Sequence, residues 1–361
     1  MGQTMRAVDI QNGAGPPSAL FINPSVPKPS PSASECLVRV KAFGLNRADT
    51  IQRAGAYPPP PGASTILGLE FSGVIEEVGK DANDEGKNDG DWKVGDEVFG
   101  LLYGGGYAEY VVANKGTLIA KPANMSWEYA AGVCEVWFTA LQALHLVGGY
   151  TSPATTRSIL WHAGASSVSI AGIQLSRHLH KFLSLDGDAR SLPPPKVYAT
   201  SRTDSKCTFC TEVLHCDAAV NTKTTPNWAQ KITSLNGDQG VDLVIDYTGA
   251  SYFQGNLDVI ARDGRIVLLG LLGGSILLEK VDISAFLRKR ARLEGSTLRS
   301  RDIAYQTDLR NLFVKTVLPG LLDGTFEHHI DRVFKWEDIR LAHELLERNE
   351  TKGKVVCTID W

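Results

Sequence analysis

A chain of 361 residues in which 43% are hydrophobic and 21% charged has the composition of a globular protein with about two domains. Its formal net charge of −3 argues against a general electrostatic attraction to nucleic acids or membrane surfaces. The sequence has no apolar run of about 18 residues and no secretory leader pattern. Its six scattered cysteines are typical of buried, reduced thiols, so we expect a cytoplasmic protein.

The first third of the chain is rich in short strand-like segments. These segments contain many β-formers, are separated by Gly, Pro and Asp, and cover residues 35–45, 70–79, 96–102 and 108–113. Residues 80–91 contain no apolar residue except Ala82, which predicts an exposed loop. This part of the chain therefore indicates a β-rich domain.

A helix and then an alternating pattern follow. Residues 125–147 predict one helix, with Ser126 as its N-cap and Glu128 favourable to the helix dipole. Strand-like segments then cover residues 157–163, 196–201, 241–249 and 264–274. The helix after the first of them has an apolar stripe at Val168, Gly172, Leu175, Leu179 and Phe182. This βαβ series predicts an α/β domain with a doubly wound parallel sheet.

The last third returns to mixed elements. A basic segment (286–301) precedes a predicted helix (336–347) and a final strand (353–361). We interpret its cations as a solvated helix face rather than a nucleic-acid site; they are Arg288, Lys289, Arg290 and Arg292. A late strand that returns to the first domain would place the α/β part in the middle. We therefore predict one domain from residues 1–130 and 276–361, and a dinucleotide-binding domain from residues 131–275.

The segment WHAGASSVSIAG (161–172) follows a strand and opens a helix, as a dinucleotide-binding loop does. Gly164 is present, but Ser167 and Ser169 occupy the last two places where glycine is usual, and Ser166 adds a third hydroxyl. The helix N-terminus attracts phosphate whatever the side chains are. Serine with a positive φ, or crowded against the strand, would cost about 1–2 kcal/mol. We expect weakened but not abolished binding, which the double substitution Ser167→Gly, Ser169→Gly should tighten.

The end of the next strand bears on the choice of cofactor. It offers Ser201, Arg202 and, a turn later, Lys206, and hydroxyls with cations suit a 2′-phosphate. The sequence therefore predicts NADPH. Asp204 is the opposing feature, because a carboxylate at this place would hold the ribose 2′-hydroxyl of NAD. The two cations also fit an ordinary solvated surface.

The segment KCTFCTEVLHC (206–216) raises the question of a metal. Cys207, Cys210, His215 and Cys216 are all possible zinc ligands. They would, however, come from one helical stretch, which would have to break to close a tetrahedral site. We predict no metal site here.

Several motifs in a fixed order resemble one family. FGLNRADTIQRAGAYPPPPGASTILGLEFSGVIEEVG (43–79), EVWFTALQALHLVG (135–148), STLRSRD (296–302) and GKVV (353–356) are similar to the medium-chain dehydrogenase/reductase superfamily, in particular its quinone-reductase branch, which includes zeta-crystallin. The resemblance covers nearly the whole chain and departs from the family at the two serines and at the loops 80–91 and 184–196. It implies a GroES-like β-rich catalytic domain and a Rossmann cofactor domain.

The resemblance also implies roles for single residues. Leu69 stands where zinc-containing members have histidine, which implies a zinc-independent enzyme. Tyr57, which precedes four prolines, and Asn46 would lie at the catalytic site, with Tyr57 bonding the acceptor's oxygen. The residues implied to contact or line the cofactor site are Thr139, Tyr247, Thr248, Leu271, Gly273, Leu298, Arg299 and Lys354. Arg47 and Asp49 fit a structural pair equally well.

Taken together, these features predict an NADPH-dependent, zinc-independent reductase of quinones or similar electrophilic carbonyls and alkenes. One alternative is an enoyl reductase, free-standing or serving a polyketide synthase. Another is a non-catalytic protein that binds NADPH or RNA, which a damaged phosphate loop would suit. We also expect a homodimer joined through GRIVLLG (264–270), as an outer strand, and GSILLEKVDI (274–283).

Overall fold

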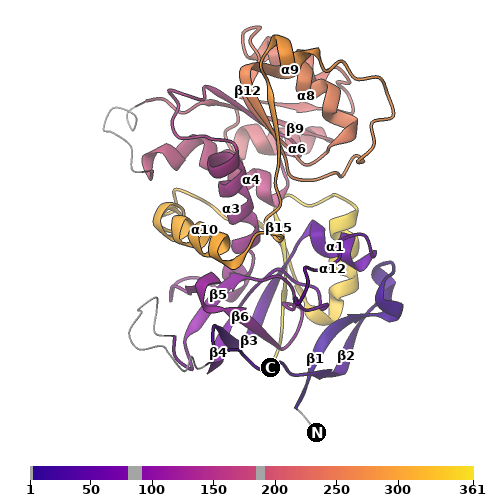
Figure 1. The fold of residues 1–361 in the computed structure, drawn as a ribbon, viewed down its shortest axis with the longest axis vertical. Helices are drawn as coiled ribbons and strands as arrows, with labels where there is room; N and C mark the ends of the chain where they lie inside the picture. Colours follow the sequence, from indigo (N-terminus) through magenta and orange to yellow (C-terminus); the bar gives the residue numbers. More distant parts are fainter. Residues whose placement is uncertain (1–2, 80–91, 184–191) are drawn as a thin grey trace. The chain divides into compact units, whose positions relative to one another are not determined.

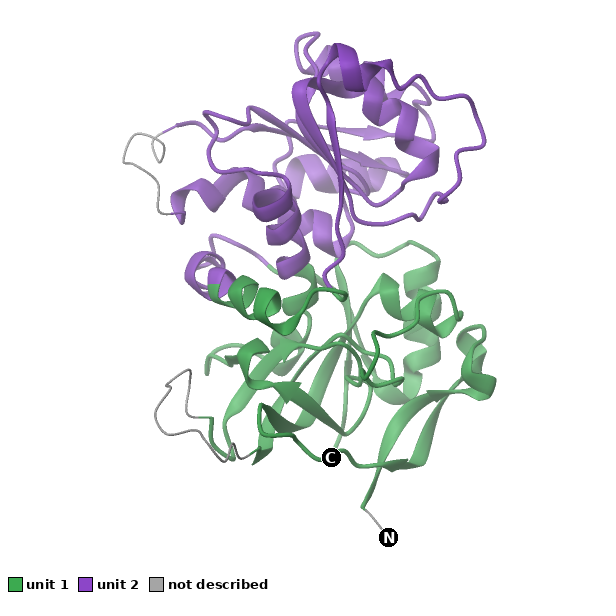
Figure 2. Cartoon of the chain, in the orientation of Figure 1, with its two compact units in different colours: residues 1–136, 299–311, 328–361 green, residues 137–298, 312–327 purple. Residues whose placement is uncertain are grey.

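The computed structural model describes residues 3–79, 92–183 and 192–361. The chain forms two compact units, coloured separately in Figure 2. Unit 1 comprises residues 1–136, 299–311 and 328–361, and unit 2 comprises residues 137–298 and 312–327. Among the described residues, no helix is long and apolar enough to cross a membrane.

Unit 1 is built on a mainly antiparallel sheet, whose early strands are drawn in indigo to magenta and whose C-terminal strand is yellow in Figure 1. Within the described part of the chain its strand order is β14-β15-β3-β4-β5-β7, and β6 also pairs with β3. The bounds are β3 Glu35–Leu45, β4 Glu70–Val78, β5 Glu97–Leu101, β6 Tyr110–Asn114, β7 Leu118–Ala120, β14 Ile330–Lys335 and β15 Lys354–Thr358. A hairpin of β1 Thr4–Ile10 and β2 Leu20–Pro27 stands beside it. The C-terminal β15 pairs antiparallel with β3, so the last strand completes the sheet begun by the first third of the chain.

In the part of the chain that the structure describes, the α-helices that lie wholly in unit 1 are α1 Arg47–Arg53, α2 Trp127–Ala131 and α12 Ile339–Glu347. Apolar side chains of the strands pack with α12 into one buried core, which includes Phe43, Phe71 and Trp336. The early strands and the late helix therefore share one hydrophobic core, although about 300 residues separate them in the sequence.

Unit 2 contains a parallel sheet with the order β10-β9-β8-β11-β12-β13 in the described residues. The strands are β8 Ser158–Trp161, β9 Lys196–Ser201, β10 Ala218–Asn221, β11 Val241–Asp246, β12 Ile260–Leu268 and β13 Arg292–Gly295. Neighbouring side chains point to opposite faces. Leu160 packs in a core with Trp228 of α7 and Leu257 of α8, whereas Trp161 lies against Gly172 of α4, where an added Cβ would be 2.1 Å from the indole. Both faces of the sheet are therefore covered by helices.

The helices of this unit are α4 Ser167–His178, α6 Asp204–Thr208, α7 Trp228–Leu235, α8 Phe253–Val259, α9 Ser284–Arg288 and α11 Leu318–Asp323. Helices α3 Cys134–Leu141 and α10 Ile303–Thr316 each contribute residues to both units. The α/β fold with a GroES-like domain and a doubly wound parallel sheet is thus confirmed.

The structure differs from the sequence predictions at three places. The predicted helix 125–147 is divided at Gly132 into α2 and α3, and its last part, Gln142–Val147, is a π-helix. The units also differ from the predicted domains: residues 276–298 and 312–327 belong to unit 2, and residues 131–136 belong to unit 1. Residues 292–295 lie in unit 2 because β13 pairs with β12. For the same reason the segment 264–270 is not an outer strand: β12 lies inside the sheet, and β13 is at its edge. The predicted loop 80–91 and most of the loop 184–196 lie outside the described residues.

Candidate active site

The parallel sheet of unit 2 reverses its direction of growth between β8 and β11. From β8 the chain proceeds to β9 and β10 on one side, and from β11 to β12 and β13 on the other. In open α/β sheets, ligands bind outside the carboxyl ends of the strands at such a switch point. The loops after β8, β9, β11 and β12 carry most of the cofactor residues predicted from the sequence. The topology therefore brings them to one edge of this sheet.

The loop after β8 has a compact geometry of its own. Gly164 donates its N–H to the Thr200 carbonyl at 2.8 Å, and an added Cβ at Gly164 would lie 2.7 Å from both Ala199 Cβ and Cys210 Sγ. Glycine is therefore required here by the close approach of the loop to β9. The left-handed residue of the loop is Ala163, with φ 47°, and neither Ser167 nor Ser169 has a positive φ. The backbone strain expected at these serines is absent.

The serines have different roles at the start of α4. Ser166 is the N-cap, and its hydroxyl accepts from the Ser169 N–H. Ser169 is fully buried, and its hydroxyl donates to the His162 carbonyl at 2.7 Å and lies 3.0 Å from Ser166 Oγ. Ser167 is half-buried in the first turn, where backbone N–H groups have no acceptor within the helix. Ser169 thus holds the loop together, while the first turn of α4 can receive an anion.

A buried polar chain, missed by the sequence analysis, supports these loops. The ring of His162 lies 2.8 Å from Thr200 Oγ1 through Nδ1 and 2.8 Å from Asn256 Oδ1 through Nε2. Asn256 donates to Asp246, whose carboxylate also accepts from the backbone N–H groups of Thr248 and Gly249. Burial lowers the pKa of His162, which keeps the ring neutral. This hydrogen-bonded series of side chains links the ends of β8, β9 and β11.

The end of β9 bears on the cofactor's 2′ position. Ser201 is 5% exposed, and its hydroxyl has no hydrogen-bond partner among the described residues. Arg202 is exposed directly after it, and Lys206 is half-buried in α6. The Asp204 carboxylate accepts from Asn221 Nδ2 at 2.7 Å through one of its two oxygens.

The loops after β11 and β12 approach each other closely. Gly273 donates to the Thr248 carbonyl at 2.7 Å, and Leu272 to that of Tyr247 at 2.9 Å. An added Cβ at Gly273 would lie 2.2 Å from Ser251 Oγ. Leu271 is 50% exposed beside them. Four of the predicted residues, Tyr247, Thr248, Leu271 and Gly273, are thus brought together.

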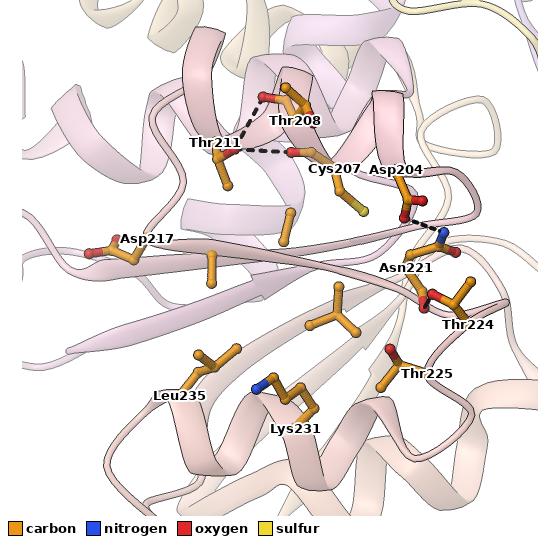
Figure 3. Close-up of a pocket in the computed structure, with 13 residues that line it drawn as sticks. Asp204, Cys207, Thr208, Thr211, Asp217, Asn221, Thr224, Thr225, Lys231 and Leu235 are labelled. Carbon is orange, nitrogen blue, oxygen red and sulfur yellow. Dashed lines mark hydrogen bonds between the residues drawn. The ribbon is translucent and has the colours of Figure 1, made fainter.

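A pocket of unit 2 lies along the edge strand β10, between α6 and α7 (Figure 3). Asp204, Cys207 and Lys231 are among its lining residues, but none of the predicted cofactor residues is. The cysteines and the histidine of 206–216 form no metal cluster: nowhere in the described ranges are three or more His, Cys, Asp or Glu side chains placed to hold a metal ion.

Unit 1 contains a buried charged cluster around Lys354. Its side chain is 1% exposed, and Nζ donates to Asn46 Oδ1 at 2.6 Å and forms an ion pair with Glu70 Oε1. Asn46 Nδ2 donates to the same Glu70 oxygen at 3.0 Å, and the other Glu70 oxygen accepts from the Glu135 N–H at 2.9 Å. Two residues predicted from the sequence, Asn46 and Lys354, therefore meet through Glu70. Pairing is what makes a buried lysine and glutamate tolerable.

Two further carboxyl groups of this unit have raised pKa values. Burial, and next the charge of Glu70, raise the pKa of Glu135 to about 8. Burial also raises the pKa of Asp49 to about 6, against hydrogen bonds from Asn46 N–H, Tyr107 Oη and Gly68 N–H. Shifts of this kind cluster at functional sites. Arg47 does not pair with Asp49, because it donates to Leu346 and Asn349 instead.

Tyr57 is half-buried, and the guanidinium of Arg299 lies 5.4 Å from the centre of its ring. Burial, and next the charge of Glu135, raise the pKa of the phenol, whereas Arg299 acts in the opposite direction. At neutral pH Tyr57 is therefore a hydrogen-bond donor. Leu298 is buried at the end of unit 2, and Thr139 is half-buried in α3.

The comparisons with known proteins agree with this arrangement. The model of the alcohol dehydrogenase GroES-like domain matches residues 32–123, and that of the zinc-binding dehydrogenase matches residues 191–314. The chain belongs to the medium-chain dehydrogenase/reductase superfamily. Rat quinone oxidoreductase is 28% identical over 359 residues, which cover 98% of each chain. The chain is therefore a quinone-oxidoreductase-like member of the superfamily, whose cofactor is NAD or NADP.

Of two solved structures similar to this chain, one is named for its dependence on NAD and the other is complexed with NADPH. An NAD-dependent alcohol dehydrogenase has a TM-score of 0.77 and 28% identity, covering 99% of this chain and 100% of its own. A mycobacterial protein complexed with NADPH has a TM-score of 0.80 and 24% identity, covering 98% and 100%. The choice between the two cofactors rests on residues of this chain.

Proposed function

We propose that this protein is an NADPH-dependent, zinc-independent reductase of quinones or similar electrophilic carbonyls and alkenes. The choice of NADPH over NADH rests on the end of β9, where the buried Ser201 hydroxyl has no partner among the described residues and precedes the exposed Arg202. One oxygen of the Asp204 carboxylate accepts from Asn221 of β10, and Asp204 lines the pocket between α6 and α7. A 2′-phosphate would satisfy the serine and pair with the arginine.

The remaining loops fit the rest of a dinucleotide. Gly164 and Gly273 stand where a side chain would collide with its surroundings, and the first turn of α4 offers backbone N–H groups for the pyrophosphate. The bound cofactor would supply a hydride. The proposed role of Tyr57 is to donate a hydrogen bond to the acceptor, as its neutral phenol can. Zinc independence is supported by Leu69, which cannot ligate a metal.

The cofactor is tested by titrating NADPH and NADH while following nicotinamide fluorescence. NADPH should bind at least about tenfold more tightly, since a charge-assisted contact contributes about 1.5–3 kcal/mol. Arg202→Gln should remove most of this difference. Equal affinities of the parent protein for NADPH and NADH would contradict the proposal that NADPH is the preferred cofactor.

The acceptor is tested by turnover with neutral quinones and with 2-enoyl thioesters. Faster reduction of quinones supports the proposal, whereas selective reduction of the thioesters would identify an enoyl reductase. A protein that binds no NADPH would support the non-catalytic alternative.

We further propose a cytoplasmic homodimer that pairs through the edge of β13. Strand β13 is outermost among the described strands, and the chain just before it exposes apolar side chains: Ile276, Leu278, Ile283 and Leu287 are 72%, 92%, 64% and 84% exposed. An open edge beside such a surface is prone to pairing. Light scattering at micromolar concentration should give twice the chain mass. A monomer would reject the dimer.

A further inference from the structure

Arg299 is a buried cation of unit 1 that lies outside the paired cluster of Lys354 and Glu70. The residue is 4% exposed, and its Nε donates to the Tyr103 carbonyl at 2.8 Å. Neither Nη1 nor Nη2 has a hydrogen-bond partner among the described residues. Buried guanidinium groups are normally paired, because an unsatisfied buried charge is costly. Two forked donors left open in this way match an oxygen anion.

The surroundings of the open donors indicate which oxygen they meet. The guanidinium lies over the ring of Tyr57, the residue proposed to contact the acceptor. The charges of Asp49, Tyr57 and Glu135 act on the guanidinium, but none of these groups is hydrogen-bonded to Nη1 or Nη2. Both nitrogens are therefore open to an oxygen that becomes negatively charged during the reaction.

We propose that Nη1 and Nη2 of Arg299 bind the acceptor oxygen that becomes negatively charged when the acceptor is reduced. This inference rests on the proposed function. The bound dihydronicotinamide would supply the hydride and be oxidised. At a carbonyl carbon the displaced electron pair moves to the carbonyl oxygen and gives an alkoxide; at a quinone the hydride adds to one oxygen and the electron pair moves through the ring to the other, which gives the hydroquinone monoanion. Either anion then takes one proton from water. Arg299 stabilises the anion, and Tyr57 donates a second hydrogen bond to it.

The role assigned here to Arg299 differs from the cofactor contact that the sequence resemblance implies. An oxyanion donor acts on turnover and leaves the affinity for NADPH unchanged, whereas a cofactor contact does the reverse. Removing one such donor typically lowers kcat by about 10²–10³-fold. A lysine at the same place keeps the charge but loses the fork, so it should restore part of the rate.

The experiment compares the parent protein with Arg299→Met, Arg299→Lys and the control Arg301→Met. Arg301 lies 4.5 Å from the ring of Tyr305, so the control also removes a cation above a tyrosine in the same segment. Three quantities are measured: kcat with a neutral quinone at saturating NADPH, the Kd of NADPH, and the binding of 4-nitrophenolate, followed by its visible absorbance. Thermal unfolding shows whether each variant is folded.

Arg299→Met is expected to lower kcat about 10²–10³-fold and to abolish nitrophenolate binding, with NADPH affinity unchanged and partial recovery in Arg299→Lys. Arg301→Met should resemble the parent. The inference is overturned if Arg299→Met binds nitrophenolate as the parent does, or if it weakens NADPH binding while kcat stays the same. If Arg299→Met fails to fold, the inference is tested with Arg299→Lys and with the nitrophenolate binding of the parent. A parent that binds no nitrophenolate overturns the inference. A parent that binds nitrophenolate through Arg299 but reduces no acceptor rejects the proposed function and leaves the anion site standing.

Discussion

The polar groups of the two units are satisfied in different ways. In unit 2, His162 and Asn256 form hydrogen bonds with neighbouring side chains, and these bonds hold the backbone loops at the ends of the strands. In unit 1, Lys354 and Glu70 neutralise each other, but Arg299 keeps two open donors beside Tyr57. A dinucleotide can be bound largely by backbone N–H groups, whereas a changing charge on an acceptor needs side chains that are ready to respond.

This comparison leads us to expect that substitutions in the two units alter different quantities. Substitutions of loop-supporting residues in unit 2 should change cofactor affinity, and substitutions of Tyr57 and Arg299 in unit 1 should change turnover. Substitutions in the paired cluster around Lys354 should change mainly stability.

The largest effect is expected from Lys354→Met. The substitution leaves the fully buried Glu70 without its cation, and breaking a buried pair in this way costs about 3–5 kcal/mol of unfolding free energy. Denaturant unfolding measures it. Lys335→Met, which removes the exposed pair with Asp360, is the control and should leave the unfolding free energy nearly unchanged. If Lys354→Met lowers the unfolding free energy no more than the control does, the buried pair is not structurally important.

Tyr57→Phe should lower kcat about 10²-fold, because the ring keeps its packing under Arg299 and loses only the donor. The Kd of NADPH should stay the same. Steady-state kinetics at saturating NADPH measure the first quantity and fluorescence titration the second. An unchanged kcat would show that the tyrosine only forms a wall of the site.

Ser169→Gly should weaken NADPH binding about tenfold, which is roughly 1.4 kcal/mol. This sign is opposite to the sequence-based expectation, because the Ser169 hydroxyl bonds the His162 carbonyl and contacts Ser166 within the loop. Ser167→Gly, at a half-buried place with no such bonds in the described structure, is the matched control and should change the Kd little. Tighter binding by Ser169→Gly would restore the earlier interpretation of a degraded loop.

The smallest effect is a pH dependence that belongs to Glu135. The charged and titratable groups that act on it are Glu70, Lys354, Asp49, Arg299 and Tyr57. Because its pKa is raised to about 8, Glu135 ionises as the pH rises through 8, and its negative charge then adds to that of Asp49 in acting on Arg299. The kcat should fall severalfold above pH 8, and Glu135→Gln should remove this fall. The same raised pKa means that folding stability declines between the ordinary glutamate pKa and pH 8. If Glu135→Gln keeps the parent's pH profile, Glu135 is not the group that causes the fall in kcat.

Much of the fold was predictable because its signals are local. The segments predicted at 35–45 and 196–201 coincide with β3 and β9, and Ser126 caps α2 as expected. Apolar periodicity and capping act within a few residues, so one sequence suffices to find them. The division at Gly132 and the outer position of β13 were not predicted, because neither follows from local periodicity.

The sequence by itself determined the alternation of strands and helices and the glycine of the nucleotide loop, since both depend on neighbouring residues. Only the tertiary structure decided which side chains meet. Lys354 reaches Glu70 across the pairing of β15 with β3, and Arg299 lies over Tyr57 from a distant segment. The sequence predicted that Ser169 weakens cofactor binding, whereas in the structure its hydroxyl stabilises the loop by donating to the His162 carbonyl. Hydrogen bonds and ion pairs of this kind depend on distances that the fold sets, and no pattern along the chain records them.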